Sequence, residues 1–474
     1  MADRALIPPR TTRLNLAVAG AALCVAAVIG ALVPISPALA VGALVAVVAA
    51  PAAVIKPRLI PHVLVVSIFA EALTIGGVTV GRLVAPLALV AVISQAFTAP
   101  PRLRDARLTL GLVAAYTLLA IASIVWTVDV KATLDSLASL GVSLVYMLGF
   151  ATLLRTRKDL RAVMWTMLGS SIVLGWLWIS QFASGVDRRF SSAGDPNFFA
   201  ALQVIVLPLF VVLASTQASL GRRLFLYVAL AVIGDSVVST LSRGGFVTLL
   251  MVVALIVLLP SRVLFTAPRE KLAFFAAALI GLAILLPLAW GPLGERFNEG
   301  FRQSHVAGDR GDLWLAAVHG YALHPVTGLG YGGFGGETFQ LLRSTPGVNL
   351  AAHARFRDSG EYVHNAYLGS LAELGPIGLV LFVGILGAAA RSLRRTARRA
   401  RAVGDGFLRS VANALLVGLL ALAASSFLLS TETSRALWLM VGMSLALPRM
   451  VAPPRPPEPS LEVAPDATTT SSRS

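Results

Sequence analysis

The feature that most constrains this chain is a long succession of apolar segments separated by short polar or basic connections. A segment of about 17–25 apolar residues is long enough to cross a bilayer as a helix, where every backbone polar group must be bonded internally. Two neighbouring pairs, 59–75 with 79–97 and 222–240 with 244–260, have very tight connections, so one pair could be re-entrant. We therefore expect an all-α, polytopic membrane protein with about 12–14 transmembrane helices. The candidate segments are 14–33, 37–55, 59–75, 79–97, 108–126, 133–153, 161–182, 197–214, 222–240, 244–260, 271–290, 366–390, 407–429 and 433–448.

The composition excludes a soluble globular protein, and the placement of the basic residues explains the positive charge by orientation in a membrane. The 474 residues are 57% hydrophobic and 13% charged, with a mean hydropathy of +0.80. A net charge of +16 on a soluble chain would suggest nucleic acid, but most of the 39 Lys and Arg residues lie in alternate connections. This alternation is what the positive-inside rule predicts. We expect a cytoplasmic (inner) membrane protein with both termini in the cytoplasm and no nucleic-acid partner.

This orientation divides the chain into four parts. Residues 1–290 form an N-terminal transmembrane bundle of about eleven segments, and 291–363 form a long extracytoplasmic loop. Residues 364–448 form the C-terminal transmembrane helices, and 449–474, rich in Pro, Ser and Thr, form a disordered cytoplasmic tail. A loop of this length is usually functional or disordered, and its apolar content favours order.

Within the loop, residues 310–323 show the apolar spacing of an amphipathic helix lying on a surface. Pro325 ends this helix, and a glycine-rich run follows at 328–336. Gly328, Gly330 and Gly333 match the G-x-G-x-x-G pattern of dinucleotide sites, but no strand precedes them. We therefore interpret the run as a turn rather than a nucleotide-binding loop.

The junction between the loop and the next apolar segment carries His364 and Asn365. A helix that begins here has unpaired N–H groups and a positive dipole end beside the imidazole, which favours a neutral histidine suited to act as a base. Gly375 falls on the same helix face as His364 unless Pro376 kinks the helix. The alternative is a helix-end histidine bonded to backbone or to a lipid headgroup.

Few basic residues are expected on the outer side, so those that lie there need another explanation. Arg243, in a tight turn between two apolar segments, could bind phosphate through its fork of donors or extend to lipid headgroups. Arg310 opens the amphipathic helix and could instead pair with a neighbouring Asp. Arg188 and Arg189 precede Asp195, which together with Pro196 favours a helix N-cap.

Acidic residues in apolar segments are functional hypotheses by default, and Glu71, Asp235 and Glu373 fall in such segments. Glu71 could instead pair with Arg82 across a turn. Glu373 lies on roughly the opposite helix face from His364, so it is a poor partner for that residue. The sequence has no D-x-D, P-loop or G-x-S-x-G motif, and we expect no metal and no cofactor.

Four motifs together resemble those of the O-antigen ligases and, more loosely, the polysaccharide polymerases of the same superfamily. The resemblance covers roughly residues 185–390, and the N-terminal segments match only in hydropathy. The motifs are His364-Asn365 followed by Gly375-Pro376-Ile377-Gly378, Ser242-Arg243-Gly244-Gly245, Arg310 with Trp314 before Pro325 and the Gly328–Phe334 run, and Asp195-Pro196-Asn197.

The resemblance implies a GT-C-like membrane glycosyltransferase, independent of metal and nucleotide sugar. Such an enzyme moves a glycan from a polyprenyl (undecaprenyl-type) diphosphate carrier to a hydroxyl of a glycan or lipid acceptor on the outer face of the membrane, with inversion. By the same resemblance, Arg243 and Arg310 hold the diphosphate and His364 is the essential histidine. Supporting roles are expected for Arg188, Arg189, Asn365, Asp195 and Asn197.

Two other functions stay open. A polysaccharide polymerase of the same superfamily differs from a ligase in its acceptor, which these motifs do not identify. A flippase or transporter of lipid-linked oligosaccharides would also use many helices and intramembrane charges. Transporters usually show internal repeats and a site near the bilayer midplane, whereas this sequence shows no repeat.

Overall fold

The computed structural model describes residues 51, 53–75, 78–98, 106–185, 194–265, 267–302, 309–348, 350–354 and 356–451. This part of the chain is almost entirely helical, with a single antiparallel hairpin of β1 (Thr74–Ile75) and β2 (Val78–Thr79). Its helices are η1 (Pro57–Leu59), α3 (Ile60–Phe69), α4 (Val80–Thr98), α5 (Arg107–Ala122), η3 (Ser123–Val125), α6 (Val130–Leu153), α7 (Arg157–Ala183), α8 (Pro196–Ser215), α9 (Leu220–Ser239), α10 (Arg243–Leu258), α11 (Ser261–Leu264), α12 (Pro268–Arg302), α13 (Asp309–Leu323), α14 (Gly333–Ser344), η5 (Leu350–His353), α15 (Phe356–Ser359), α16 (Ala366–Ala402), α17 (Gly406–Ser425), α18 (Arg435–Ala446) and η6 (Leu447–Met450).

The predicted class, an all-α polytopic membrane protein, is confirmed. Each predicted apolar segment from 59–75 onward coincides with a helix. In the described residues, seven helices are long and apolar enough to cross a membrane, namely α4, α5 with η3, α6, α7, α8, α16 and α17. Two further apolar helices, Pro57–Phe69 and Arg243–Leu258, are shorter. Segment 14–33 and most of 37–55 lie outside the described residues.

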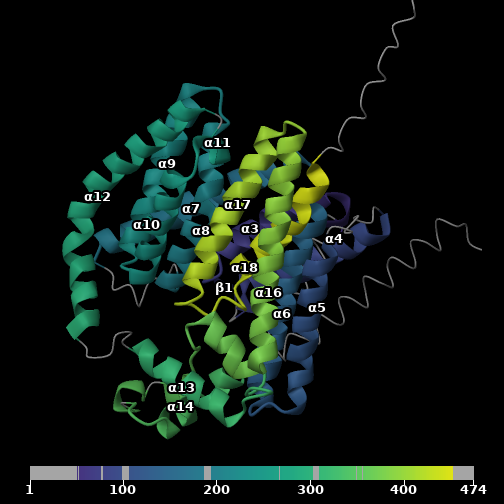
Figure 1. Cartoon of the computed structure of the whole chain (residues 1–474), viewed down its shortest axis with the longest axis vertical. Helices are drawn as coiled ribbons and strands as arrows, with labels where there is room; N and C mark the ends of the chain where they lie inside the picture. Colours follow the sequence, from purple (N-terminus) through teal and green to yellow (C-terminus); the bar gives the residue numbers. More distant parts are fainter. Residues whose placement is uncertain are drawn as a thin grey trace, which may run out of the picture.

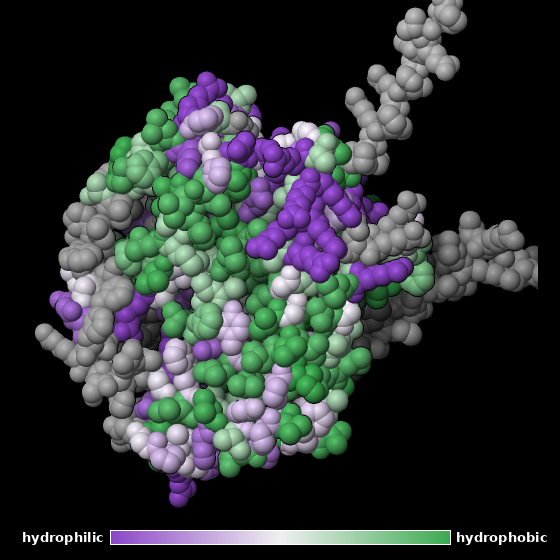
Figure 2. Space-filling model, in the orientation of Figure 1, coloured by the Kyte–Doolittle hydropathy of each residue, from purple (hydrophilic) through white to green (hydrophobic). Residues whose placement is uncertain are grey.

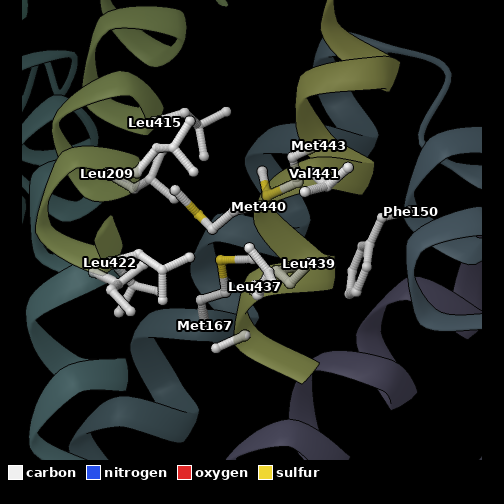
Figure 3. Packing of buried hydrophobic residues seen from close by; sticks show 14 of the residues in the cluster. Phe150, Met167, Leu209, Leu415, Leu422, Leu437, Leu439, Met440, Val441 and Met443 are labelled. Atoms are coloured by element: carbon white, nitrogen blue, oxygen red, sulfur yellow. The ribbon is translucent and has the colours of Figure 1, made fainter. Parts of the chain in front are cut away.

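The core of the bundle lies where α18 meets α6, α7, α8 and α17. Every residue of α18 is buried, and nearly every residue of α8 is buried too, as expected of helices that are apolar all round. Figure 3 shows Leu437, Leu439 and Met440 of α18 among side chains of the neighbouring helices. These neighbours include Leu209 of α8, Leu415 and Leu422 of α17, Met167 of α7 and Phe150 of α6.

The two ends of the bundle differ in chemistry. Figure 1 shows α13 and α14 together at the lower end, whereas α16 and α17 reach the upper end. The C-terminal part of α16 carries a run of arginines from Arg391 to Arg401, and Figure 2 shows hydrophilic side chains gathered there above a broad hydrophobic surface. The bundle therefore has a strongly basic end and, away from it, a separate layer of short helices.

That layer, which we call the loop layer, comprises residues 309–363 in their described parts and has its own small core. The predicted amphipathic helix at 310–323 is confirmed as α13, whose Leu313, Ala316 and Ala317 are buried in that core. The predicted boundary at residue 291 falls inside a helix, because α12 continues to Arg302. The described parts of the long segment are therefore largely helical.

The glycine-rich run attaches the loop layer to the start of α16. Leu329 and Gly330 donate their backbone N–H groups to the carbonyls of Ala372 and Glu373, both at 2.9 Å. The N–H of Gly332 donates to the Glu373 side chain at 2.8 Å. Gly328 has a left-handed backbone (φ +69°), and a Cβ there would overlap the backbone of Glu373. The run is a docking turn, as expected, and only glycine fits this close approach.

The predicted alignment of His364 with Gly375 on one helix face is wrong. His364 precedes the N-cap residue Asn365 and has a left-handed backbone, with φ +54°. Gly375 is non-helical (φ +67°, ψ −168°), so α16 is kinked just before Pro376. The kink brings the carbonyl of Val326 so close to Gly375 that any Cβ would overlap it.

Candidate functional site

His364 is held at the start of α16 by its neighbours on both sides. The side chain of Asn365 caps the helix, accepting from the N–H groups of Tyr367 and Leu368 at 3.1 Å each. The backbone N–H of His364 donates to the Ser430 hydroxyl at 3.1 Å. These bonds offset the cost of a left-handed non-glycine residue, which is uncommon and concentrates at functional sites.

The imidazole of His364 is partly buried beside a carboxylate. Its Nε2 lies 3.4 Å from Oε1 of Glu361, and the side chain is 19% exposed. Its Nδ1 is buried and has no hydrogen-bond partner among the described residues. The pairing with Glu361 favours a proton on Nε2, which leaves the lone pair on Nδ1.

Arg243 begins α10 two positions after a second strained residue. Leu241 is the other left-handed non-glycine residue in the described chain, with φ +52°. Ser242 caps α10 by accepting from the N–H of Gly245 at 3.1 Å, and its hydroxyl donates to Oδ1 of Asn197 at 2.8 Å. The start of α10 is therefore bonded to the start of α8.

Asp195 is the N-cap of α8 with proline at the first helical position, which confirms the structural interpretation of this motif. Its Oδ1 accepts from the N–H groups of Asn197 at 2.7 Å and Phe198 at 3.0 Å. The cap fixes the turn from which Asn197 reaches Ser242. Arg188 and Arg189, expected to support this site, lie outside the described residues.

Arg310 lies within electrostatic range of the groups just described. Burial lowers the pKa of its guanidinium, the carboxylate of Asp195 raises it, the charge of Arg243 lowers it and Glu361 raises it. Arg310 also lines a small pocket with Asn197, Ser242 and Gly244. The repulsion between the two guanidinium charges would be relieved by an anion bound near both, such as a phosphate.

Of the residues singled out from the sequence, the structure brings together Arg243, Arg310, Asp195 and Asn197. Glu361 links this group to His364, because it pairs with the imidazole and also influences Arg310. The residues come from the starts of α8, α10 and α16 and from α13, which lie far apart in sequence.

Sequence reasoning missed Glu361, Ser430 and Glu432. Glu432, in the connection between α17 and α18, is only 6% exposed, and burial raises the pKa of its carboxyl to about 7. Its position directly before an apolar segment was a usable signal, as for other acids in apolar segments. Glu361 and Ser430 gave no signal of their own, since only the fold places them beside His364.

One predicted pairing, that of Glu71 with Arg82, is wrong. Glu71 pairs with Arg435 at 3.0 Å rather than with Arg82, whose guanidinium donates to Ser139 at 3.1 Å. Arg435 is almost fully buried, so it gains more from a carboxylate partner than an exposed arginine would.

Asp312, two residues after Arg310, bonds Nε2 of His353 at 2.8 Å. The acidic groups that raise the pKa of Arg310 are Asp195 and Glu361, described above. No group of three or more metal-ligating His, Cys, Asp or Glu side chains is found in the described parts of the chain.

Comparison with known families places this geometry in context. Residues 228–383 match the family model described as O-antigen ligase. This stretch is similar to an O-antigen ligase domain. The domain contains Arg243, Arg310 and His364, and it ends shortly after the kink of α16. A search of the curated proteins found no match.

The O-antigen ligase domain gives the chain a coarse function. Together with the apolar helices, it supports a multi-pass membrane protein with a glycosyltransferase-like activity. It also supports a glycan-type substrate and the lipid bilayer as surroundings.

Proposed function

We propose that this protein transfers a glycan from a polyprenyl diphosphate carrier to an acceptor hydroxyl, without a metal or cofactor and with inversion at the anomeric carbon. The observation that carries this function is the convergence of Arg243 and Arg310, inside an O-antigen ligase domain, with the Glu361–His364 pair. Two guanidinium groups and an imidazole are the groups that displacement of a diphosphate by a hydroxyl requires.

The arginines would hold the leaving group. As the anomeric C–O bond breaks, its electron pair moves to the diphosphate oxygen, and negative charge grows there. Guanidinium groups donate planar, charge-assisted hydrogen bonds to phosphate oxygens, so they stabilise this charge. Arg243 also lies at a helix N-terminus, where backbone N–H groups and the helix dipole add to the effect.

His364 would receive the proton of the acceptor. The acceptor oxygen forms the new bond to the anomeric carbon while its O–H proton passes to the imidazole. With Glu361 beside Nε2, the nitrogen that keeps the lone pair for this proton is Nδ1, which is buried and has no partner among the described residues. A positioned general base of this kind contributes about 10²–10⁴ in rate.

We also propose that the loop layer and the site face the outside of the cytoplasmic membrane, with both termini in the cytoplasm. The arginine-rich end of α16 lies at the opposite end of the molecule from α13 and α14 (Figure 1). By the positive-inside rule this end belongs to the cytoplasm.

The test is transfer by the purified protein in detergent, with a polyprenyl-diphosphate-linked oligosaccharide as donor. We expect His364→Ala to abolish transfer while donor binding survives. His324→Ala, which removes an exposed histidine of the loop layer, is the matched control and should transfer normally. Unchanged turnover in His364→Ala would rule out the role of the imidazole.

The same assay separates the alternatives. A ligase yields a new conjugate, whereas a polymerase of the superfamily yields longer glycans that remain on the carrier. A flippase or transporter has no membrane to act across in detergent, so any glycan transfer there excludes transport as the main activity.

A further inference from the structure

A second pocket is lined by residues close to His364 and is distinct from the small pocket at Arg310. Its volume is about 300 Å³, a size typical of sites for small ligands. The side chains of α3, α7 and α8 form its apolar walls, and the connection between α17 and α18 contributes polar residues. The Asp195-Pro196-Asn197 turn belongs to both pockets, since Asp195 lines this one and Asn197 lines the other.

Two lining residues bring this pocket to the candidate base. Ser430 lines it and accepts the backbone N–H of His364 at 3.1 Å. Tyr362 also lines it and precedes His364 by two positions. The backbone of His364 therefore lies next to this pocket, and Glu361 connects its imidazole to the arginine side.

The lining has the chemistry of a carbohydrate site. Phe69, Phe198 and Phe199 supply aromatic surface, against which the C–H face of a sugar ring packs. The hydroxyls of Tyr362 and Thr433 and the carboxyl groups of the rim can donate to or accept from sugar hydroxyls.

The two rim carboxyl groups are held in place before any ligand arrives. Glu71 pairs with Arg435 at 3.0 Å. Asp195 uses only Oδ1 for its two cap bonds, so Oδ2 takes part in neither. Groups held in this way lose little conformational entropy when they bind a ligand.

The charge of the lining selects among sugars. Glu71 and Asp195 are acidic, and the described lining contains no Lys, Arg or His; the cation that pairs with Glu71 is Arg435, which does not line the pocket. An anionic sugar would meet the carboxylate of Asp195 and no cation of the lining, while Glu71 is already paired with Arg435, so the lining disfavours an anionic sugar relative to a neutral one.

We infer that this pocket binds an uncharged sugar residue of the acceptor and directs one of its hydroxyls to His364. This role deepens the proposed function and rests on it, because a pocket beside the base is an acceptor site only if His364 accepts the proton. The donor then occupies the arginine side, and the two substrates meet at the imidazole.

The test fills the pocket and leaves the donor site intact. Ala72 lines the pocket and touches Gly194, whereas the adjacent Leu73 does not line it and is 55% exposed. Ala72→Trp should therefore block the pocket, and Leu73→Trp is the matched control. If Ala72→Trp does not fold, Thr433→Trp enters the same pocket from the connection between α17 and α18.

Binding is measured by saturation-transfer NMR with neutral methyl hexosides and with methyl glucuronide. We expect neutral hexosides to bind the wild type and Leu73→Trp, and to bind Ala72→Trp at least about tenfold more weakly. Methyl glucuronide should bind the wild type about tenfold more weakly than the neutral hexosides. Affinity for the polyprenyl diphosphate donor should be the same in all variants.

Equal hexoside binding by Ala72→Trp and Leu73→Trp, or equal binding of the glucuronide, would overturn the assignment while the proposed function stands. Hexoside binding that Ala72→Trp removes, from a wild-type protein that transfers no glycan, would instead overturn the proposed function and leave a sugar pocket without a reaction.

Discussion

Replacing Arg310 by glutamine tests whether this residue binds an anion or supports the fold. In the free protein the guanidinium is partly buried and close to Arg243, and the net effect of its surroundings is to lower its pKa. Burial and Arg243 disfavour the positive charge, whereas Asp195 and Glu361 favour it. The first two effects are the larger, so the surroundings as a whole disfavour the charge. Removing the charge should relieve this cost, whereas the donor diphosphate would lose a partner.

The two roles of Arg310 predict changes in donor affinity and in the free energy of unfolding that differ enough to be distinguished. A hydrogen bond to a charged group is worth about 1.5–3 kcal/mol, so Arg310→Gln should weaken donor binding roughly 10- to 150-fold. The free energy of unfolding should stay within about 0.5 kcal/mol of the wild type, or rise slightly. If Arg310 were instead a structural partner of Asp195 and Glu361, breaking that buried pairing would cost about 3–5 kcal/mol.

The assay pairs donor titration with thermal unfolding in the same detergent. Arg343→Gln, which removes an exposed arginine near the end of α14, is the control and should leave both unchanged. A variant of Arg310 that binds donor normally but unfolds several degrees lower would refute the anion-binding role.

Two further predictions concern the fold around the site. Gly328→Ala should destabilise the protein by more than about 2 kcal/mol, because it adds overlap with the backbone of Glu373 to the cost of a left-handed alanine. Gly347→Ala, left-handed but with open space around it, should lose only about 1–2 kcal/mol in the same thermal-unfolding measurement; equal losses would contradict the docking role of the turn. Because burial raises the pKa of Glu432 from 4.5 in the unfolded chain to about 7, ionisation opposes folding, and stability should fall by on the order of 3 kcal/mol as the pH rises through this range. Glu432→Gln should remove that slope in unfolding measured across the range, and an identical slope in both proteins would argue against a buried carboxyl.

Local patterns predicted the elements of this protein well. The apolar segments are helices because length and hydropathy are local properties that a membrane helix cannot avoid. The amphipathic spacing at 310–323 gave α13, and Asp195 before Pro196 gave a helix N-cap, since both signals act within one or two turns. The positions of Arg243 and Arg310 relative to each other were not readable in this way, and only the family resemblance grouped them.

Long-range partners were the part that sequence could not supply. The sequence suggested that Glu71 pairs with Arg82, the nearest cation along the chain. Folding instead brings the buried Arg435 of α18 next to Glu71. Glu361 is an ordinary acid of a polar loop until the left-handed turn at His364 folds the imidazole against it. The kink of α16 at Gly375 depends on the carbonyl of Val326 from another segment, which no helical wheel contains.

The docked glycine run has a mechanical consequence. Bonds from Leu329, Gly330 and Gly332 fasten the loop layer to the segment of α16 that precedes the kink. Any tilt of α13, which carries Arg310, must then drag the first turns of α16 along with it, and the bend at Gly375 is where such a tilt meets the least resistance. A substrate that shifts Arg310 on binding would in this way also move His364, because both are joined to the same part of α16.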